Sequence, residues 1–359
     1  MAHPEETHAR WPRAWGEPPA RGLLRADPSH FQVDEELVFE PSGSGEHCLI
    51  QLRKRGENTV WIARRLARLA GLPLRDVGYA GLKDRHAVAT QWFSVRLAGK
   101  SEPDWTALNG ETVQVLCVER HHRKLRPGAV RRNRFRILIS DLSGDEVATG
   151  ERLSRVAASG VPNYFGEQRF GWNGENLRHA AALFTGAGQV PDRKRRGIYL
   201  SAARSWLFNE ILARRVEAGS WDRPMAGDVL GLDGRSAVFS QHDDPDPEIV
   251  ARASRLELHP TGPLWGAGDP PSAGDVRDLE MQIARENGSL AEGLVRFGLK
   301  QERRALRLRV TELTFERSAG TLLLGFSLYS GSYATSVLRE IVRYTIPDPS
   351  GGVTSDTLY

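Results

Sequence analysis

The stretch ALRLRVTELTF, residues 305–315, alternates apolar and polar side chains near the end of a chain of 359 residues. A period of two places every second side chain on one face of a β-strand, and the residues sharing this face are Leu306, Leu308 and Val310. A second strand pattern, TLLLGFSLYSG, follows at residues 321–331, and a helix is expected from Ser332. The helix carries an apolar stripe of the kind that packs on a sheet, formed by Ala334, Val337, Leu338, Ile341 and Val342. The C-terminal part is therefore predicted to belong to a sheet covered by a helix.

Similar patterns occur near the N-terminus. Alternation predicts four strands there, at Cys48–Leu52, Phe93–Leu97, Val113–Cys117 and Phe135–Ile139. A helix is expected after Asn58 or Thr59, either of which can cap it, and Gly71 would end it. Another helix is expected from about Asp145 to Ser159. Strands at both ends of the chain suggest one domain built from both ends.

The middle of the chain has a different character. LSAARSWLFNEILARRV, residues 200–216, is predicted to be helical, and residues 219–274 are rich in Gly, Pro and Asp. Short strands within GDVLGLDGRSAVF, residues 227–239, would form a small subdomain. The pattern predicts an α+β protein whose sheet domain is interrupted by an insertion.

Composition limits the class of protein. With 40% hydrophobic and 26% charged residues, the chain is expected to be globular rather than disordered. No apolar run is long enough to span a membrane, and residues 1–22 lack the apolar region of a signal peptide. Cys48 and Cys117 have no metal-ligand or disulfide spacing. A cytoplasmic protein is therefore expected, in which both cysteines stay reduced.

Basic residues are unevenly distributed although the net charge is only +4. The run RHHRKLRPGAVRRNRFR, residues 120–136, holds eight Lys and Arg residues and no acid, and RKRRG follows at residues 193–197. Like charges at this density repel one another unless a polyanion neutralises them. Nucleic acid is the favoured partner, with a solvated charged surface as the alternative.

A single carboxylate stands out in GYAGLKDRHAVATQWFSV, residues 78–95, where Asp84 lies between Lys83 and Arg85. Asp84 is either a catalytic group or one half of a surface ion pair. The chain has no phosphate-binding loop, HExxH motif or GxSxG motif. A metal site is not expected, because His121 and His122 would point to opposite faces of a strand among many cations.

The same stretch, together with VPNYFGEQRFG at residues 161–171, resembles the TruD family of tRNA pseudouridine synthases. Five further motifs match in the family's order within residues 22–342: DPSHFQVDE (27–35), GSGEH (43–47), RRNRF (131–135), LSAARSWLFN (200–209) and GSYATSVLRE (331–340). Seven ordered matches are far more specific than any single motif.

The resemblance implies a discontinuous catalytic domain with a central mixed or antiparallel sheet, made of residues 1–158 plus 306–359. It also implies a family-specific α/β insertion domain at residues 159–305. tRNA would bind in a basic cleft between the two domains, with uridine 13 as the expected target. A monomer is expected.

The reaction implied by the family is the isomerisation of uridine to pseudouridine in RNA, without a cofactor or a metal. It requires a base removed from its stack and an ionised carboxylate that attacks covalently or assists deprotonation. By resemblance this carboxylate is Asp84, whose charge the adjacent Lys83 and Arg85 would stabilise.

The resemblance also implies residues that bind the substrate. Phe31, Asn133 and Tyr333 match substrate-contacting positions, and Phe135 would stack on the uracil. Tyr333 stands where the family has Phe, so its hydroxyl needs a partner, and Arg25 replaces an expected Lys. From the residues alone, core aromatics are the favoured interpretation of the two phenylalanines.

Two other functions remain open. One is a tRNA-binding or chaperone protein without turnover. The other is a hydrolytic RNA enzyme that uses Asp84 and His86.

Overall fold

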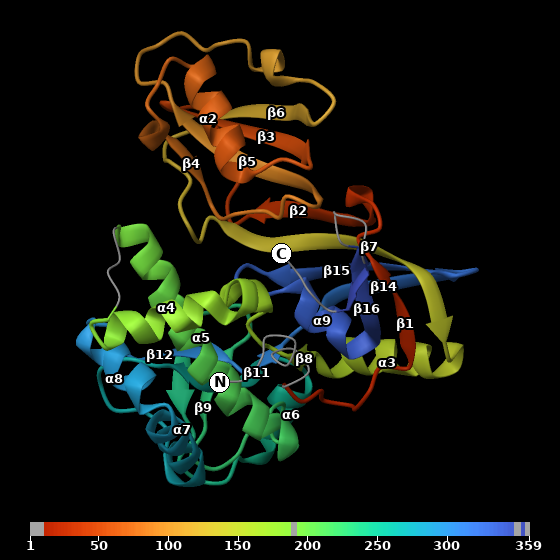
Figure 1. Ribbon diagram of the computed structural model, residues 1–359, viewed down its shortest axis with the longest axis vertical. Coiled ribbons are helices and arrows are strands. Elements are labelled where there is room, and N and C mark those ends of the chain that lie inside the picture. Colours follow the sequence, from red (N-terminus) through yellow and green to blue (C-terminus); the bar gives the residue numbers. More distant parts are fainter. Residues whose placement is uncertain (1–10, 188–191, 348–352, 356–359) are drawn as a thin grey trace.

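The computed structural model describes residues 11–187, 192–347 and 353–355. It is an α+β fold with one large mixed sheet (Figure 1). The 11 strands come from both ends of the described chain: β1 (Ala20–Leu24), β2 (Phe31–Leu37), β3 (His47–Arg55), β4 (Val77–Tyr79), β5 (Val88–Arg96), β6 (Val113–His121), β7 (Val130–Gly144), β14 (Thr311–Ser318), β15 (Thr321–Tyr329), β16 (Val342–Pro347) and β17 (Val353–Ser355).

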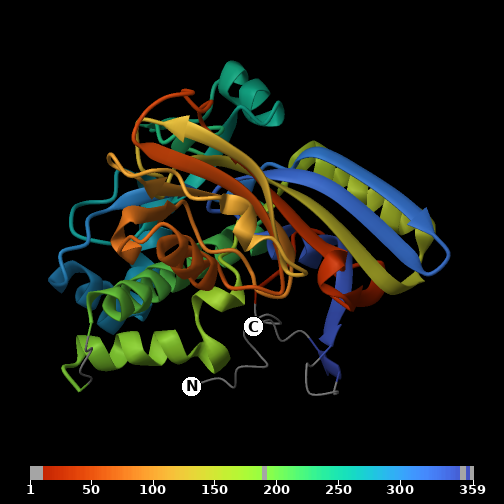
Figure 2. The same cartoon turned by 90° about the horizontal axis from the view of Figure 1, so that it is seen from above.

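Strand β7 organises this sheet. It is 15 residues long and pairs antiparallel with β1, β2 and β15. The β1–β16 and β2–β5 pairs are parallel, which makes the sheet mixed. Figure 2 shows β15 along β7 and β14 on the outer side of β15, with α3 (Glu146–Ser159) across one face of these strands. The main core therefore joins strands from both ends of the chain.

The four predicted N-terminal strands lie within β3, β5, β6 and β7. Strands β3 to β6 form the upper lobe in Figure 1. Helix α2 (Thr59–Leu69) packs on this lobe through Ile62 and Leu66. Asn58 caps the helix, because its side chain accepts a hydrogen bond from the backbone N–H of Val60.

The stretch at residues 305–315 is not one strand. It is divided among β12 (Glu302–Ala305), β13 (Arg307–Leu308) and β14. Leu306, Leu308 and Val310 are all buried, as the alternation predicts. The first two strands pair with β11 and β8 (Val161–Pro162), outside the large sheet. The positive φ of 56° at Glu312 accompanies a shift of register in β14, so the chain bends here.

Helix α9 (Ala334–Ile341) is shorter than predicted. It begins after Tyr333 rather than at Ser332, and Val342 is the first residue of β16. The other four residues of the predicted apolar stripe are buried against the sheet. Pairing of β16 with β1 ends the helix, because the backbone of Val342 bonds across the sheet instead of along the helix.

The middle of the chain forms a four-stranded sheet in the order β10-β9-β11-β12 with helices around it (Figure 1). The three strands not yet placed are β9 (Val229–Leu232), β10 (Val238–Ser240) and β11 (Leu258–Leu264). The helices are α4 (Glu175–Phe184), α5 (Arg193–Glu217), α6 (Pro247–Ser254), α7 (Gly274–Glu286) and α8 (Gly288–Arg296). A domain boundary near residues 159 and 305 stays a prediction.

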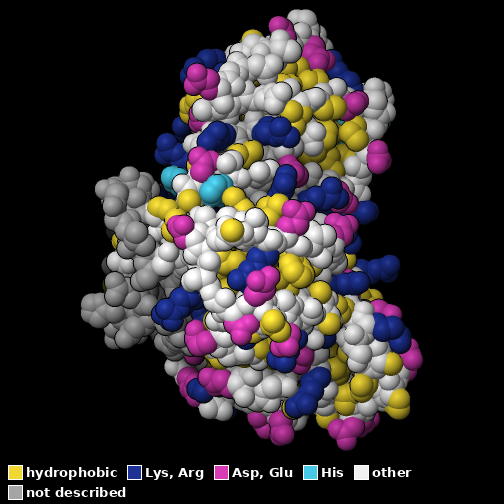
Figure 3. Space-filling model, turned by 90° about the vertical axis from the view of Figure 1, so that its right-hand side faces the viewer, with side chains coloured by type: hydrophobic (Ala, Val, Ile, Leu, Met, Phe, Trp, Pro, Cys, Tyr) yellow, Lys and Arg dark blue, Asp and Glu magenta, His cyan; other side chains and the backbone are white. Residues whose placement is uncertain are grey.

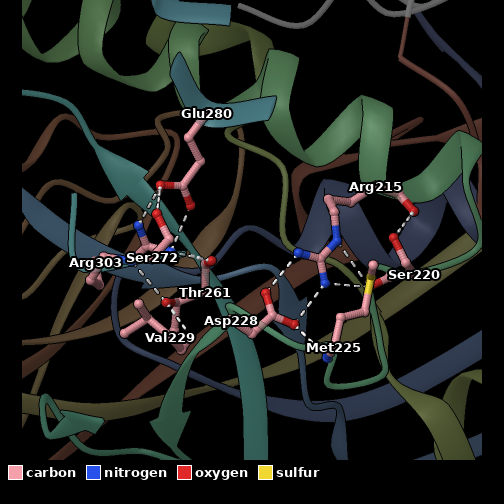
Figure 4. Close-up of polar contacts among 9 residues, drawn as sticks. All are labelled: Arg215, Ser220, Met225, Asp228, Val229, Thr261, Ser272, Glu280 and Arg303. Atoms are coloured by element: carbon pink, nitrogen blue, oxygen red, sulfur yellow. Dashed lines mark hydrogen bonds and ion pairs between the residues drawn. The ribbon is translucent and has the colours of Figure 1, made fainter. Parts of the chain in front are cut away.

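Two buried ion pairs fasten helices to this smaller sheet (Figure 4). Arg215 of α5 lies 2.7 Å from Asp228, which also accepts the backbone N–H of Met225. Glu280 of α7 lies 2.8 Å from Arg303 of β12. Breaking such a pair leaves an uncompensated buried charge, so these contacts fix the two helices in place.

Within the described residues, no helix combines the length and the apolar character that crossing a membrane requires.

Candidate active site

The seven site residues that the family resemblance implies, including Arg25 and Lys83, all line one pocket of about 210 Å³. We call it the Asp84 pocket. Its walls come from β2, β7, the loop before β5, residues 166–168 and residues 332–335. The seven are Arg25, Phe31, Lys83, Asp84, Asn133, Phe135 and Tyr333. The fold therefore gathers residues from the beginning and the end of the chain around one carboxylate.

The Asp84 carboxylate is held by two contacts. Its Oδ1 accepts the backbone N–H of His86 at 3.0 Å, and its Oδ2 lies 2.7 Å from Nη1 of Arg25. The Asp84 side chain is 16% exposed, so it is accessible from the pocket yet largely enclosed. Such an anchored carboxylate has a fixed orientation toward whatever enters the pocket.

The structure corrects the expectation that Lys83 or Arg85 supports Asp84. Lys83 forms its ion pair with Glu35 of β2, and Arg85 donates to the backbone carbonyl of Gly56. Successive residues of the loop point in different directions, so sequence neighbours do not become partners. Arg25 reaches Asp84 from the end of β1 instead.

Arg25 is also placed by its backbone and by an aromatic ring. Its φ of 62° lies in the left-handed region, which few residues other than glycine adopt. Its guanidinium carbon lies 4.2 Å from the centre of the Phe31 ring, a cation–π contact. A planar guanidinium can stack and pair at the same time, so Arg serves both contacts where the family resemblance leads us to expect Lys.

Lys54 supports the same loop, and the sequence did not single it out. Its ammonium donates to the backbone carbonyls of Asp84 at 2.8 Å and Glu57 at 2.7 Å. Its side chain has no solvent exposure, and burial lowers the pKa of Lys54 to about 8. The nearby charge of Asp84 acts in the opposite direction and raises this pKa. A signal was present, because Lys54 continues the inward period of two that runs through Ile50 and Leu52.

The first residue of α2 anchors the loop from the other side. The Thr59 hydroxyl accepts the backbone N–H of Lys83 and donates to the Gln91 side chain, both at 3.0 Å. Gln91 in turn donates to the carbonyl of Gly81 at 2.8 Å. The loop that carries Asp84 is therefore tied to β3, α2 and β5.

Phe31 and Phe135 form an aromatic wall of the pocket and also belong to the core. They are 5% and 7% exposed, and their ring centres lie 6.0 Å apart at 73°. Phe135 contacts Phe326 of β15 from another side. Phe31 and Phe135 are therefore core aromatics that also line the pocket, and their contact with a substrate stays a prediction.

Asn133 and Tyr333 complete the pocket. The buried Oδ1 of Asn133 has no hydrogen-bond partner among the described residues, so it is available to a donor on a ligand. The Tyr333 hydroxyl accepts a 2.7 Å hydrogen bond from Arg169, which also donates to Ser201. Arg169 is the partner that this hydroxyl was expected to need.

The basic run at residues 120–136 is partly neutralised. Three of its arginines lie within 4 Å of a carboxylate: Arg120 near Glu102, Arg131 near Glu36 and Arg134 near Glu312. Figure 3 shows one face of the molecule, on which Lys and Arg are interspersed with Asp and Glu. Other members of the run gather around a hollow of about 640 Å³, lined by His122, Arg123, Lys124 and Arg126 together with Arg96, His47 and the two acids Glu46 and Asp76. We call this second site the basic hollow.

No group of three or more His, Cys, Asp or Glu residues in the described parts of the chain is arranged to hold a metal ion. The chemistry that this pocket offers is that of a fixed carboxylate beside a cation and an aromatic wall.

The fold is that of a solved structure. A crystal structure described as a putative tRNA pseudouridine synthase D from Methanosarcina mazei superposes with a TM-score of 0.69. The match covers 92% of this chain and 95% of that chain at 22% sequence identity, which establishes a common α+β architecture.

Sequence comparison is more specific. The family model described as tRNA pseudouridine synthase D (TruD) matches residues 12–183 and 174–341. A protein of Methylococcus capsulatus named tRNA pseudouridine synthase D is 51% identical over 343 residues, 95% of each chain. One with the same name from Nitrosococcus oceani is 50% identical, over 91% of this chain and 92% of its own. The chain belongs to the TruD family.

Proposed function

We propose that this chain isomerises uridine to pseudouridine in tRNA and that the Asp84 carboxylate is the catalytic group. Membership of the TruD family supports the reaction. The observation that supports the assignment to Asp84 is its place in the pocket: an anchored carboxylate, paired with Arg25, beside the wall of Phe31 and Phe135.

The reaction breaks the C1′–N1 bond of uridine and forms a C1′–C5 bond, while C5 loses a proton and N1 gains one. The base must leave its stack to reach such a pocket. Phe135 would support the face of the uracil, and Asn133 Oδ1 would accept its N3–H. Asp84 would attack the nucleotide or take up a proton. No cofactor takes part in this scheme.

tRNA would bind with its phosphates on cations near the pocket. We place the polyanion in a cleft between the sheet domain and the insertion. The basic hollow lies at the other end of β3 and β5 from the Asp84 loop and would hold a more distant part of the RNA backbone. Uridine 13 is the proposed target, and the enzyme would act as a monomer in the cytoplasm. A map of pseudouridines in total RNA with and without this protein tests the position.

The test of catalysis is the substitution Asp84→Asn, which keeps the size of the side chain but removes its charge. We expect pseudouridine formation on a purified tRNA to disappear while tRNA binding persists, because phosphate contacts elsewhere supply most of the affinity. The matched control is Asp269→Asn, since the Asp269 side chain is 91% exposed and lines neither the Asp84 pocket nor the basic hollow. Substantial turnover by a folded, tRNA-bound Asp84→Asn protein would contradict the assignment.

The same assay separates the alternatives. A gel of incubated tRNA reveals hydrolysis, because isomerisation leaves strand length unchanged. Binding by the wild-type chain without pseudouridine would indicate a tRNA-binding protein. A melting curve for each variant shows whether lost activity reflects lost folding.

A further inference from the structure

Another hollow, distinct from the basic hollow, lies beside the Asp84 pocket. It has a volume of about 460 Å³ and shares Leu82, Lys83, Asp84 and Gln168 with the pocket, so the two are continuous. The rest of its lining is Arg85, His86, Gly171 and Trp172. We call it the Trp172 groove.

Two large apolar side chains line this groove while remaining exposed. Leu82 is 66% exposed and Trp172 is 46% exposed. They come from separate segments, the Asp84 loop and the residues before α4. Apolar side chains exposed together around a concave site are typical of a binding surface.

The backbone that carries Trp172 is shaped for this position. Gly171, Asn173 and Gly174 have φ values of 77°, 52° and 70°, so the residue before the tryptophan and the two residues after it lie at positive φ. A Cβ at Gly171 would come within 2.8 Å of the side chain of Asn176. Glycine adopts positive φ readily, so of the three only Asn173 is in a conformation that most residues avoid. The turn therefore presents Trp172 in a defined place.

Basic side chains accompany the apolar ones. Arg85 and His86 line the groove and are exposed, whereas Lys83, at the boundary with the pocket, is paired with Glu35. Aromatic faces together with cations are the means by which proteins hold single-stranded nucleic acid. A uridine removed from its stack leaves a neighbouring base without its stacking partner.

We propose that the Trp172 groove is a second nucleotide subsite, in which the base next to the target uridine stacks on Trp172. Leu82 forms the other apolar contact, and Arg85 and His86 contact the adjoining phosphate. The subsite rests on the proposed function, because the target uridine is assigned to the Asp84 pocket. Stacking there would hold the strand open while the uridine reacts.

The test uses a tRNA transcript with the fluorescent base 2-aminopurine beside the target uridine, bound to the full-length protein. We expect wild-type protein to quench the fluorescence by stacking. Trp172→Ala should remove the quenching and weaken binding by roughly 5- to 150-fold, the fold-change that corresponds to the free energy of base–aromatic stacking. Trp172→Phe should restore part of both effects, because it keeps an aromatic face, and Leu82→Ala should weaken both.

The matched control is Trp61→Ala. Trp61 is 40% exposed on α2 but lines neither the Asp84 pocket nor the Trp172 groove. Quenching and affinity should match the wild type in this variant. Equal quenching in wild type and a folded Trp172→Ala protein would overturn the subsite, as would an absence of quenching in the wild type.

Failure of the proposed function gives a different result. If the wild type forms no pseudouridine, that function is wrong, and the quenching difference between Trp172→Ala and Trp61→Ala still decides the subsite. If turnover is normal and Trp172→Ala changes neither quenching nor affinity, the subsite alone is refuted.

Discussion

Asp84 takes its ion-pair partner from a distant residue rather than from its neighbours in the sequence. Arg25 pairs with its carboxylate, Lys54 binds its backbone carbonyl, and the N–H of His86 fixes the other carboxylate oxygen. Lys83 pairs with Glu35, and Arg85 donates to the backbone carbonyl of Gly56. The cations beside Asp84 are therefore brought there by the packing of β1 and β3 against the loop.

Lys54 gives a pH-dependent prediction at this scale. Burial lowers the pKa of Lys54 from 10.5 to about 8, with Asp84, Lys83, Glu57 and Glu35 as the charged groups around it. Between pH 8 and 10.5 the unfolded chain binds more protons at this residue than the folded chain, so stability should rise with pH. The shift corresponds to about 3 kcal/mol at most.

The measurement is the free energy of unfolding of wild type and Lys54→Met across this pH range. The wild type should gain stability relative to the variant as the pH rises. Parallel curves for the two proteins would show that Lys54 is not buried in its charged form.

At the scale of elements, the loop that carries Asp84 is positioned by the start of α2. Asn58 caps the helix, and the next residue, Thr59, bonds both the loop and β5. The Thr59 hydroxyl thus links α2, which packs on the upper lobe, to the loop that carries Asp84.

Thr59→Val should reveal this connection. The substitution keeps the shape of the side chain but leaves the Lys83 N–H and the Gln91 side chain without their partner. We expect a loss of about 1–3 kcal/mol in unfolding free energy, together with a lower kcat. Thr59→Ser retains the hydroxyl and should keep both near the wild-type values. A Thr59→Val protein with unchanged stability and turnover would contradict the role assigned to the hydroxyl.

At the scale of the molecule, one sheet is assembled from the two ends of the chain. β15 pairs with eight successive residues of β7, and β16 pairs with β1. Residues buried on β15 and α9 share the main core with Ile137 and Ile139 of β7. The N-terminal strands therefore need the C-terminal segment to complete their core.

A fragment of residues 1–158 should consequently be unstable. It lacks β14, β15, α9 and β16, so β7 would expose an unpaired edge and an apolar face. The measurement is the thermal unfolding of the fragment, with the full chain as the control. Cooperative melting of the isolated fragment would show that the predicted boundary is wrong.

Binding of tRNA should depend strongly on salt. Each neutralised phosphate contributes roughly 0.7–0.9 to the slope of log affinity against log salt. Replacing Arg123 and Arg126, which line the basic hollow, with alanine should reduce that slope by about 1.4–1.8. Arg255→Ala is the control, because Arg255 is an exposed arginine on another part of the surface, paired with Glu257. A salt-independent wild type would contradict the electrostatic prediction.

The sequence by itself determined the classes of many elements and part of the lining of the pocket. Periodicity placed α2, α3 and four of the N-terminal strands, β3, β5, β6 and β7, because burial of one face imposes a repeat that is visible in one dimension. The family resemblance named seven of the residues that line the Asp84 pocket, although their roles stay predictions.

Only the tertiary structure decided how these residues are paired. It divided residues 305–315 among three strands, joined Asp84 to Arg25 and buried Lys54 against the loop. A repeat in the sequence shows which face of an element is buried, but not which distant segment covers it. Partners are set by the packing of segments that lie far apart in the chain. The periodicity of one sequence does not show which of these segments meet.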